Sequence, residues 1–236
     1  MRVALITGSS RGLGLALCQA LKQKGYTIVA TVRTQKDITR LEREHNDVHF
    51  IPCDVTSTRD VKALKKTVLM RFHRLDILIN NAGILPDNER PGEFLDHSLI
   101  NTPIKHFQKA LNVNALGAIR MAKSFIPLLI STQNGEKKII NISSQAGQLS
   151  SLSWGLPAYS LSKVALNAAT QLIASEFDGH NIICVSVSPG WVRTDMGGTQ
   201  ADQDVDHAAH SLVHLILQLT REDNGKFLRN GHSISW

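Results

Sequence analysis

A glycine-rich turn between a short apolar strand and an amphipathic helix is the feature that most constrains this chain. Gly8, Gly12 and Gly14 separate the strand-like residues 3–7 from residues 12–24, whose apolar side chains recur at helical intervals. Glycines permit a tight turn and a close backbone approach to a ligand. The start of a helix offers free N–H groups and a positive dipole end to a pyrophosphate. The turn therefore predicts a dinucleotide site, with an ordinary strand–helix connection as the alternative.

The alternation of strand and helix continues along the chain. Strands are predicted at residues 3–7, 27–32, 48–53, 76–80, 138–142 and 182–187. Helices are predicted at residues 12–24, 37–45, 61–72, 157–177 and 207–219, and at 103–130, where Pro127 bends or ends the helix. Residues 86–101 are predicted as a loop and residues 225–236 as an added edge strand. The order predicts an α/β fold in one domain, residues 1–236: a three-layer α/β/α Rossmann fold with a doubly wound parallel sheet of about seven strands.

The composition excludes several other classes of protein. With 236 residues, 42% of them hydrophobic, the chain can bury a core, so disorder is not expected. Its longest apolar runs fall short of the about 20 residues of a membrane helix, and no signal peptide is expected. Cys18, Cys53 and Cys184 are isolated in sequence, so neither a metal site nor a disulfide framework is predicted. These features favour a reducing, cytoplasmic location.

The charge balance is compatible with an anionic partner. The chain has 26 Lys and Arg residues against 20 Asp and Glu residues, a net charge of +6. Such a charge suits nucleic acid or an anionic cofactor. The sequence has no module of interleaved basic and aromatic residues, however, and the cations of residues 61–72 are typical of a solvated helix face. An anionic cofactor is therefore favoured over nucleic acid.

Two arginines indicate which dinucleotide the turn binds. NAD-binding Rossmann units carry an Asp or Glu after the second strand, where it holds the ribose 2′-hydroxyl. Here Arg33 occupies that place, and Arg11 lies inside the glycine turn. A guanidinium can bind a 2′-phosphate through two hydrogen bonds. NADP(H) is therefore predicted in preference to NAD(H), and two solvated surface arginines are the alternative.

A tyrosine and a lysine at helical spacing form the predicted chemical centre. Tyr159 and Lys163 are four residues apart, so both point from the same face of the predicted helix. A nearby ammonium favours the phenolate, which would lower the tyrosine pKa from its usual value near 10. A tyrosine adjusted in this way can protonate a carbonyl oxygen or deprotonate an alcohol. Ser144, after the fifth strand, can hold the substrate oxygen opposite Tyr159. A surface Tyr/Lys pair is the alternative.

Together these features resemble the compact, single-domain type of short-chain dehydrogenase/reductase. The motifs that carry the resemblance are Thr7-Gly8-x3-Gly12-x-Gly14, Asp54-Val55, Asn80-Asn81-Ala82-Gly83, Asn114, Asn141-x-x-Ser144, Tyr159-x3-Lys163 and Pro189-Gly190 with Thr194. They follow one another in the order expected for that family, and the strand–helix pattern extends the likeness over nearly the whole chain. The resemblance implies hydride transfer between a nicotinamide cofactor and a carbonyl or alcohol.

The resemblance also implies a role for each matched residue. Tyr159 would be the general acid/base, Lys163 would lower its pKa and hold the nicotinamide ribose, and Ser144 would orient the substrate carbonyl. Asn114 would keep a bound water in a proton relay, with helix packing as the alternative. The predicted cofactor-binding residues are Gly8, Ser10, Arg11, Gly12, Leu13, Gly14, Arg33, Asp54, Val55, Asn81, Ala82, Gly83, Tyr159, Lys163, Pro189, Gly190, Val192 and Thr194.

The segment between Ser144 and Tyr159 departs from the family's pattern. The interval is longer than the commonest one, and the extra residues, near 148–154, are expected to reshape the pocket wall. The segment 188–198 is short, so little chain is expected to cover the substrate. The closing residues resemble those of C-factor-like and sniffer-like carbonyl reductases. That likeness implies an open pocket lined by Leu149, Trp154, Trp191 and Met196, for which core or interface packing is the alternative.

The sequence therefore predicts an NADP(H)-dependent oxidoreductase acting on a small carbonyl or alcohol substrate. A dinucleotide-binding signalling protein of the same fold is the alternative, although it would not need the complete set Asn114, Ser144, Tyr159 and Lys163. A sugar-nucleotide epimerase shares the Tyr-x3-Lys motif but generally has a larger C-terminal substrate region. A homodimer or homotetramer formed through the helices at 103–130 and 157–177 is expected, with neither nucleic acid nor membrane as a partner.

Overall fold

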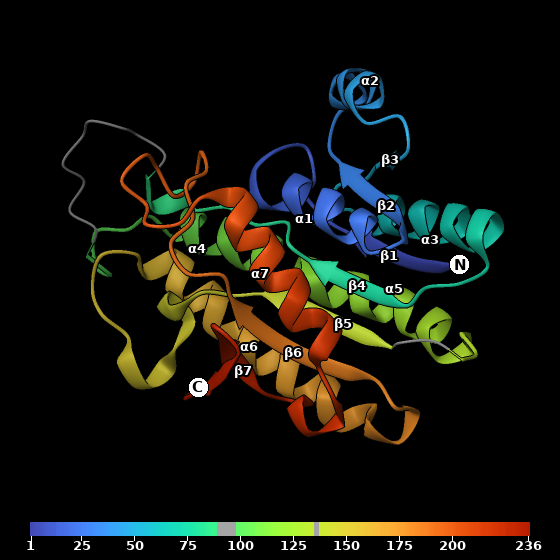
Figure 1. The fold of residues 1–236 in the computed structure, drawn as a ribbon. Helices are drawn as coiled ribbons and strands as arrows, with labels where there is room; N and C mark the ends of the chain where they lie inside the picture. The colour runs from blue at the N-terminus through green and yellow to red at the C-terminus, as the bar shows by residue number, and fades with distance from the viewer. Residues whose placement is uncertain (89–97, 135–136) are drawn as a thin grey trace.

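The computed structural model describes residues 1–88, 98–134 and 137–236, and one twisted sheet forms its centre (Figure 1). The strands are β1 (Arg2–Ile6), β2 (Tyr26–Val32), β3 (His49–Pro52), β4 (Ile77–Asn80), β5 (Lys138–Ile142), β6 (Ile183–Ser188), β7 (Phe227–Arg229) and β8 (His232–Ile234). They lie in the order β3-β2-β1-β4-β5-β6-β7-β8 and are parallel except for the pair β7–β8. The chain winds outward from β1 in one direction and from β4 in the other, which confirms the predicted doubly wound sheet.

Helices cover both faces of the sheet because successive residues of a strand point to opposite sides. Ala4 and Ile6 of β1 belong to one buried apolar cluster, and Val3 and Leu5 belong to the other. The first cluster includes residues of α1 (Gly12–Gln23), α2 (Gln35–Glu44) and α7 (Val205–Gln218). The second includes residues of α3 (Thr58–Phe72), α5 (Gly117–Ser131) and α6 (Pro157–Glu176). This three-layer arrangement confirms the predicted fold class.

The end of the chain forms two strands where the sequence predicted one. β7 extends the parallel sheet beside β6, and β8 folds back on β7 as an antiparallel hairpin. Asn230 and Gly231 form the two-residue turn, and both have positive φ. That conformation suits a hairpin turn, because its twist matches the twist of the flanking strands. The sheet therefore has eight strands instead of about seven.

The long helix predicted over 103–130 is interrupted by a wider turn. α4 (Ile104–Ala110) passes into a π-helical turn, Leu111–Leu116, before α5 begins. Pro127 lies inside α5, which continues to Ser131, so the alternative in which the helix ends at Pro127 is wrong. Asn114, a predicted site residue, lies in the π-helical turn, a conformation that recurs at functional sites. Most of the loop predicted over 86–101 lies outside the described residues.

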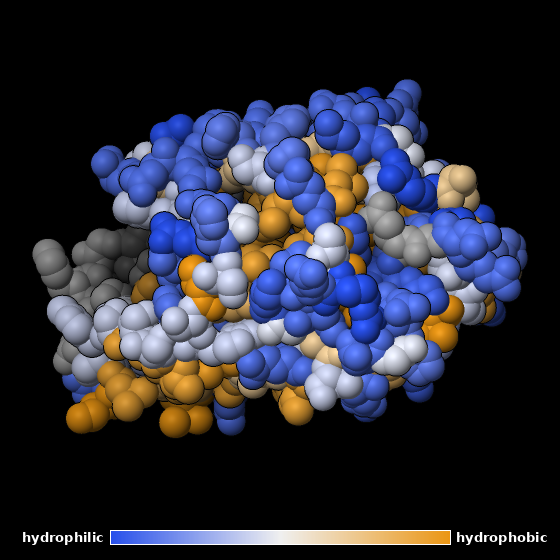
Figure 2. All heavy atoms as spheres, turned by 60° about the horizontal axis from the view of Figure 1, so that its bottom comes forward, coloured by the Kyte–Doolittle hydropathy of each residue, from blue (hydrophilic) through white to orange (hydrophobic). Residues whose placement is uncertain are grey.

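The continuous stretch Ile104–Ser131 is long and apolar enough to cross a membrane by length and composition, and 56% of its most apolar window is buried inside the fold. Its residues Met121, Phe125 and Leu129 are fully buried in the core on one face of the sheet. The stretch is therefore accounted for as a core helix. Figure 2 shows a largely polar surface with apolar side chains gathered at one end, along the lower edge of that view.

Candidate active site

A cavity of about 800 Å³ opens where the parallel strands end. The last residues of β2, β5 and β6 contribute to its lining, and so do residues that follow β1, β3 and β4. In an open α/β sheet this edge is the usual place for ligands. Every predicted site residue lines the cavity except Asn114, and Trp191 and Met196 line it as well. Leu149 and Trp154 do not line it; they are 62% and 87% exposed, so their predicted place in the pocket wall is wrong.

The glycine turn is shaped by a tight contact with the end of β4. Gly8 has a φ of +70°, and a Cβ there would lie 2.8 Å from Ala82 Cα. A Cβ on Gly14 would lie 2.5 Å from both Asn81 Nδ2 and Gly8 O. Asn81 Nδ2 also donates hydrogen bonds to the carbonyls of Thr7, at 2.9 Å, and Gly8, at 3.2 Å. Close contacts within the protein itself therefore require glycine at both positions.

The hydroxyl of Thr7 joins the first strand to the fourth. Its Oγ1 accepts hydrogen bonds from the N–H groups of Asn81 and Ala82, both at 3.0 Å. On the other side, Thr31 Oγ1 accepts from Gly8 N–H at 3.3 Å. Thr7 thus links the turn to the residues after β4, and Thr31 links it to β2. Sequence reasoning did not assign either contact, because neither is local in the chain.

The start of α1 offers unclaimed hydrogen-bond donors to the cavity. Arg11 is its N-cap residue, and no side chain caps the first turn. Ser10, Gly12 and Leu13 line the cavity beside it. A helix N-terminus in this position suits a phosphate group, because free N–H groups and the helix dipole both attract an anion. The residues present therefore fit the pyrophosphate of a dinucleotide.

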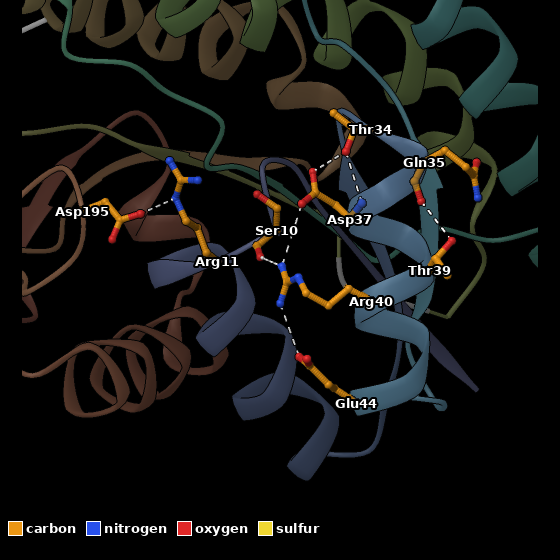
Figure 3. A network of polar contacts seen from close by, with 9 residues as sticks. All are labelled: Ser10, Arg11, Thr34, Gln35, Asp37, Thr39, Arg40, Glu44 and Asp195. Atoms are coloured by element: carbon orange, nitrogen blue, oxygen red, sulfur yellow. Dashed lines mark hydrogen bonds and ion pairs between the residues drawn. The ribbon is translucent and has the colours of Figure 1, made fainter.

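Arg11 engages a different partner from the one that the sequence suggested. Its Nε lies 2.6 Å from Asp195 Oδ2, and both side chains are more than 70% exposed. In Figure 3 the Arg11 side chain points to Asp195 and away from Thr34 and α2. The ion pair links the glycine turn to the segment after β6. Exposed pairs contribute only about 0–1 kcal/mol, so an anionic ligand can replace Asp195 at small cost.

A third arginine, which the sequence analysis missed, reaches the glycine turn from α2. Arg40 Nη2 donates a hydrogen bond to the Ser10 carbonyl at 3.0 Å, while Nη1 lies 3.4 Å from Glu44 (Figure 3). Arg33, directly after β2, also lines the cavity. It is exposed and makes no ion pair within the described parts of the chain. The side of the cavity next to β2 therefore carries a free guanidinium.

Tyr159 and Lys163 of α6 line the cavity together with Ser144, which follows β5. Lys163 Nζ lies 5.5 Å from the centre of the Tyr159 ring and donates a hydrogen bond to the Ile142 carbonyl at 2.8 Å. Burial lowers the pKa of Lys163 from 10.5 to about 8. Burial also raises the pKa of Tyr159 to about 12, against the opposing effect of a hydrogen bond with Ser144. In the protein itself the tyrosine pKa is thus raised, where the sequence predicted a lowered one, because desolvation outweighs the hydrogen bond with Ser144.

Asn114 lies behind the cavity and is 2% exposed. Its Oδ1 accepts from Ile84 N–H at 2.8 Å, and its Nδ2 donates to the Ile84 carbonyl at 2.9 Å and to Ser162 Oγ at 2.8 Å. Both amide hydrogens are therefore used within the protein. The side chain fixes the main chain after β4, and the role of Asn114 in a water relay stays a prediction.

Asp54 stabilises its own loop. Its Oδ1 accepts hydrogen bonds from Thr56 N–H at 2.8 Å and Thr56 Oγ1 at 2.7 Å. Val55 packs in the second core cluster and would contact a Cβ on Gly117 at 2.8 Å. Both residues line the cavity, so a bound ligand would meet a loop that the protein already holds rigid.

Comparison with known proteins identifies related chains. The family described as short chain dehydrogenase matches residues 2–205. Among curated proteins, the short-chain dehydrogenase anuI of Penicillium roqueforti is 31% identical over 89% of this chain and 86% of its own length. The L-fucose dehydrogenase of Mus musculus is 33% identical over 92% of this chain and 75% of its own length.

Solved structures of similar fold cover the whole chain. The carbonyl reductase Sniffer of D. melanogaster has a TM-score of 0.89 and 31% identity, with 100% of both chains covered. The NADPH-bound carbonyl reductase from chicken fatty liver has a TM-score of 0.88 and 30% identity, also with 100% of both chains covered. At this identity and coverage the likeness extends beyond the fold to the family.

Proposed function

The chain belongs to the short-chain dehydrogenase family, and from this premise we propose that it is an NADP(H)-dependent carbonyl reductase with Tyr159 as general acid/base. One observation carries the proposal. A single cavity joins an uncapped helix start, flanked by Arg11 and Arg33, to the group Ser144, Tyr159 and Lys163. The first part suits an anionic dinucleotide, and the second suits proton transfer to a carbonyl oxygen.

The proposed cofactor is NADP(H), which when bound supplies or accepts a hydride at its nicotinamide ring. The first turn of α1 would hold the pyrophosphate, and Arg33 would bind the 2′-phosphate. Arg40 would support this site by holding the Ser10 carbonyl in place. The carbonyl reductase from chicken fatty liver, similar along its entire length, is an NADPH-bound structure, which favours the same cofactor here.

The side chains of this protein supply the proton and the orientation. Ser144, which shares a hydrogen bond with Tyr159, would donate to the carbonyl oxygen of the substrate. Tyr159, whose pKa is raised to about 12, carries its proton at neutral pH and can transfer it to that oxygen as negative charge develops. The Lys163 ammonium near its ring stabilises the phenolate that remains. Reprotonation of the phenolate from solvent completes the cycle.

The proposed substrate is a small, largely apolar carbonyl compound. Leu85, Val113, Leu156, Trp191 and Met196 line the cavity together with the catalytic group. Trp191 and Met196 are 52% and 44% exposed, so this wall is open to solvent. Trp191 is nonetheless fixed, because its Nε1 donates to the Gly197 carbonyl at 2.8 Å. A flat or extended apolar ketone or aldehyde can approach along such a wall.

We further propose that two copies of the chain associate through the outer faces of α4, α5 and α6. Large apolar side chains are exposed on α4, on the turn that leads into α5, and on α6: Ile104, Leu116, Leu161 and Leu172. Contiguous exposed apolar surface is typical of an interface between subunits. Sedimentation equilibrium of the purified chain would test this association, and a monomer at all concentrations would contradict it.

The test of the proposed function is a reductase assay with a matched variant. The purified protein is mixed with NADPH and a panel of aldehydes, diketones and quinones, and NADPH oxidation is followed by its absorbance. Tyr159→Phe removes only the phenolic hydroxyl, so it should abolish turnover and leave NADPH binding, measured by fluorescence, unchanged. Turnover retained in Tyr159→Phe would refute the assigned acid. NADPH binding without turnover of any panel member would instead favour the dinucleotide-binding signalling protein.

A further inference from the structure

The helix that carries Tyr159 is capped by a residue far away in the sequence. The N-cap residue of α6, Leu156, has no side chain that can accept a hydrogen bond, and Pro157 has no N–H group. The next two N–H groups are bound by Asp87: Ala158 N donates to Oδ1 at 3.1 Å and Tyr159 N donates to Oδ2 at 2.9 Å. Each carboxylate oxygen thus holds one residue of the first turn.

Asp87 is buried, with 3% of its surface exposed. A buried carboxylate needs hydrogen bonds from its surroundings, because it has lost its contact with water. Here the two main-chain donors provide them, and the positive end of the α6 dipole stabilises the charge. The carboxylate and the start of the helix therefore fix each other in one geometry.

The peptide groups around Tyr159 are held from the other side by Asn114. Ser162 Oγ donates to the Tyr159 carbonyl at 2.6 Å, and Asn114 Nδ2 donates to Ser162 Oγ at 2.8 Å. Asn114 also binds both the N–H and the carbonyl of Ile84, three residues before Asp87 in the chain. A closed path of hydrogen bonds and short chain segments thus runs from Asp87 through Tyr159, Ser162 and Asn114 back to residues 84–87.

We propose that Asp87 is a positioning residue that sets the place of the Tyr159 hydroxyl in the active site. The inference rests on the proposed function, because it assumes that Tyr159 transfers the proton. The main chain of Tyr159 is fixed by Asp87 at its N–H and by Ser162 at its carbonyl. A shift of the first turn would move the hydroxyl at the far end of the side chain. Misplacement by about 1 Å can reduce catalysis about 100-fold.

The experiment compares Asp87→Asn and Asp87→Ala with Asp76→Asn as a matched control. Asp76 is a fully buried carboxylate that accepts from Val3 N–H and from Arg74 Nε, both at 2.8 Å. It precedes β4, at the edge of the sheet opposite the cavity. Its substitution reproduces the loss of a buried charge without touching the site. All variants are assayed with NADPH and the carbonyl of the panel that the wild-type protein reduces fastest, at a temperature where circular dichroism shows each to be folded.

Asp87→Ala should lower kcat about 10- to 100-fold and leave the NADPH affinity unchanged. Asp87→Asn keeps one acceptor oxygen for one N–H group, so its kcat should lie between those of the wild type and Asp87→Ala. Asp76→Asn should lose stability but keep its kcat. Wild-type kcat in the folded Asp87 variants would overturn the inference, and so would an equal loss of kcat in Asp76→Asn. If Tyr159→Phe itself retains turnover, the proposed function fails instead, so the two failures are distinguishable.

A measurement on the wild-type protein covers the case in which the Asp87 variants do not fold. First-turn N–H groups of a helix normally have no partner and exchange with solvent rapidly. The amides of Ala158 and Tyr159 should exchange slowly in hydrogen-exchange NMR, because Asp87 binds both. Rapid exchange at both amides in the folded protein would overturn the inference.

Discussion

The Lys163 ammonium nitrogen lies 5.5 Å from the centre of the Tyr159 ring, and both residues project from the first two turns of one helix. Burial favours the neutral form of each group: the pKa of Lys163 falls to about 8, and the pKa of Tyr159 rises to about 12. At neutral pH the pair therefore consists of a charged lysine and a protonated tyrosine. That is the state required to donate a proton to a carbonyl oxygen.

This relationship predicts how carbonyl reduction depends on pH. The pKa of Lys163 is about 8, so its ammonium is lost as the pH rises through that value. Without the positive charge the Tyr159 phenolate is less stable and the phenol becomes a weaker acid. The kcat for reduction should therefore be constant near pH 6–7 and fall above about pH 8, as measured by NADPH oxidation with saturating substrate. A kcat that rises through pH 8–9 would contradict this assignment.

Lys163→Met should increase stability while abolishing turnover. The pKa of Lys163 is lowered from 10.5 to about 8, so the protonated lysine destabilises the fold below about pH 8, and this effect fades as the pH approaches 10.5. The shift corresponds to about 3 kcal/mol, but the Ile142 carbonyl loses its donor in the variant, so a gain of about 1–2 kcal/mol is expected at pH 7.

Urea unfolding of wild type and Lys163→Met at pH 7 and at pH 10 measures this gain. The difference between the two proteins should be largest at pH 7 and should shrink at pH 10. If the variant is less stable than the wild type at pH 7, the contacts of Lys163 stabilise the fold by more than the burial of its charge destabilises it.

Arg33→Ala should remove most of the preference for NADPH. Arg33 lines the cavity without an ion-pair partner in the described part of the chain, so its guanidinium is available to a 2′-phosphate. Loss of a charge-assisted contact of about 1.5–3 kcal/mol corresponds to about a 10- to 100-fold weaker NADPH affinity. NADH affinity should not change. Arg43→Ala, an exposed cation on α2, is the control and should leave both affinities unchanged.

Fluorescence titration with the two cofactors decides the outcome. If wild-type protein binds NADH and NADPH equally, the proposed cofactor preference is wrong whatever the variant does. If Arg33→Ala keeps a strong preference for NADPH, Arg11 or Arg40 carries the selectivity.

The fold and most of the cavity lining could be predicted from the sequence because their signals are local. The alternation of strand and helix patterns predicted the sheet, and the glycine turn predicted a dinucleotide site at the end of its first strand. Contacts between distant segments could not be predicted. The need for glycine at Gly8 arises from Ala82, and the cap of α6 comes from Asp87, more than sixty residues away in each case. Neither leaves a pattern of spacing that a single sequence reveals.

The same limit explains the outcome for Asn114 and Arg11. Asn114 matched a motif, but its amide is saturated by Ile84 and Ser162. Arg11 was placed correctly in the glycine turn, yet its charge is directed to Asp195, a residue of the segment after β6. A motif specifies where a side chain starts, whereas its direction depends on the neighbours that folding brings to it.

Asp195→Asn should strengthen the binding of NADPH. The Arg11–Asp195 ion pair is exposed on both sides, so it contributes about 0–1 kcal/mol, and breaking it frees the Arg11 guanidinium for an anion. Removal of the carboxylate also takes one negative charge away from the rim of the cavity. NADPH affinity should therefore rise up to about fivefold at low salt, and the gain should decrease as salt screens the charges. Titrations at low and high salt measure the effect, with Asp202→Asn, an exposed carboxylate further along the same segment, as the control. A weaker NADPH affinity in Asp195→Asn would show that the ion pair helps to build the site instead of competing with the ligand.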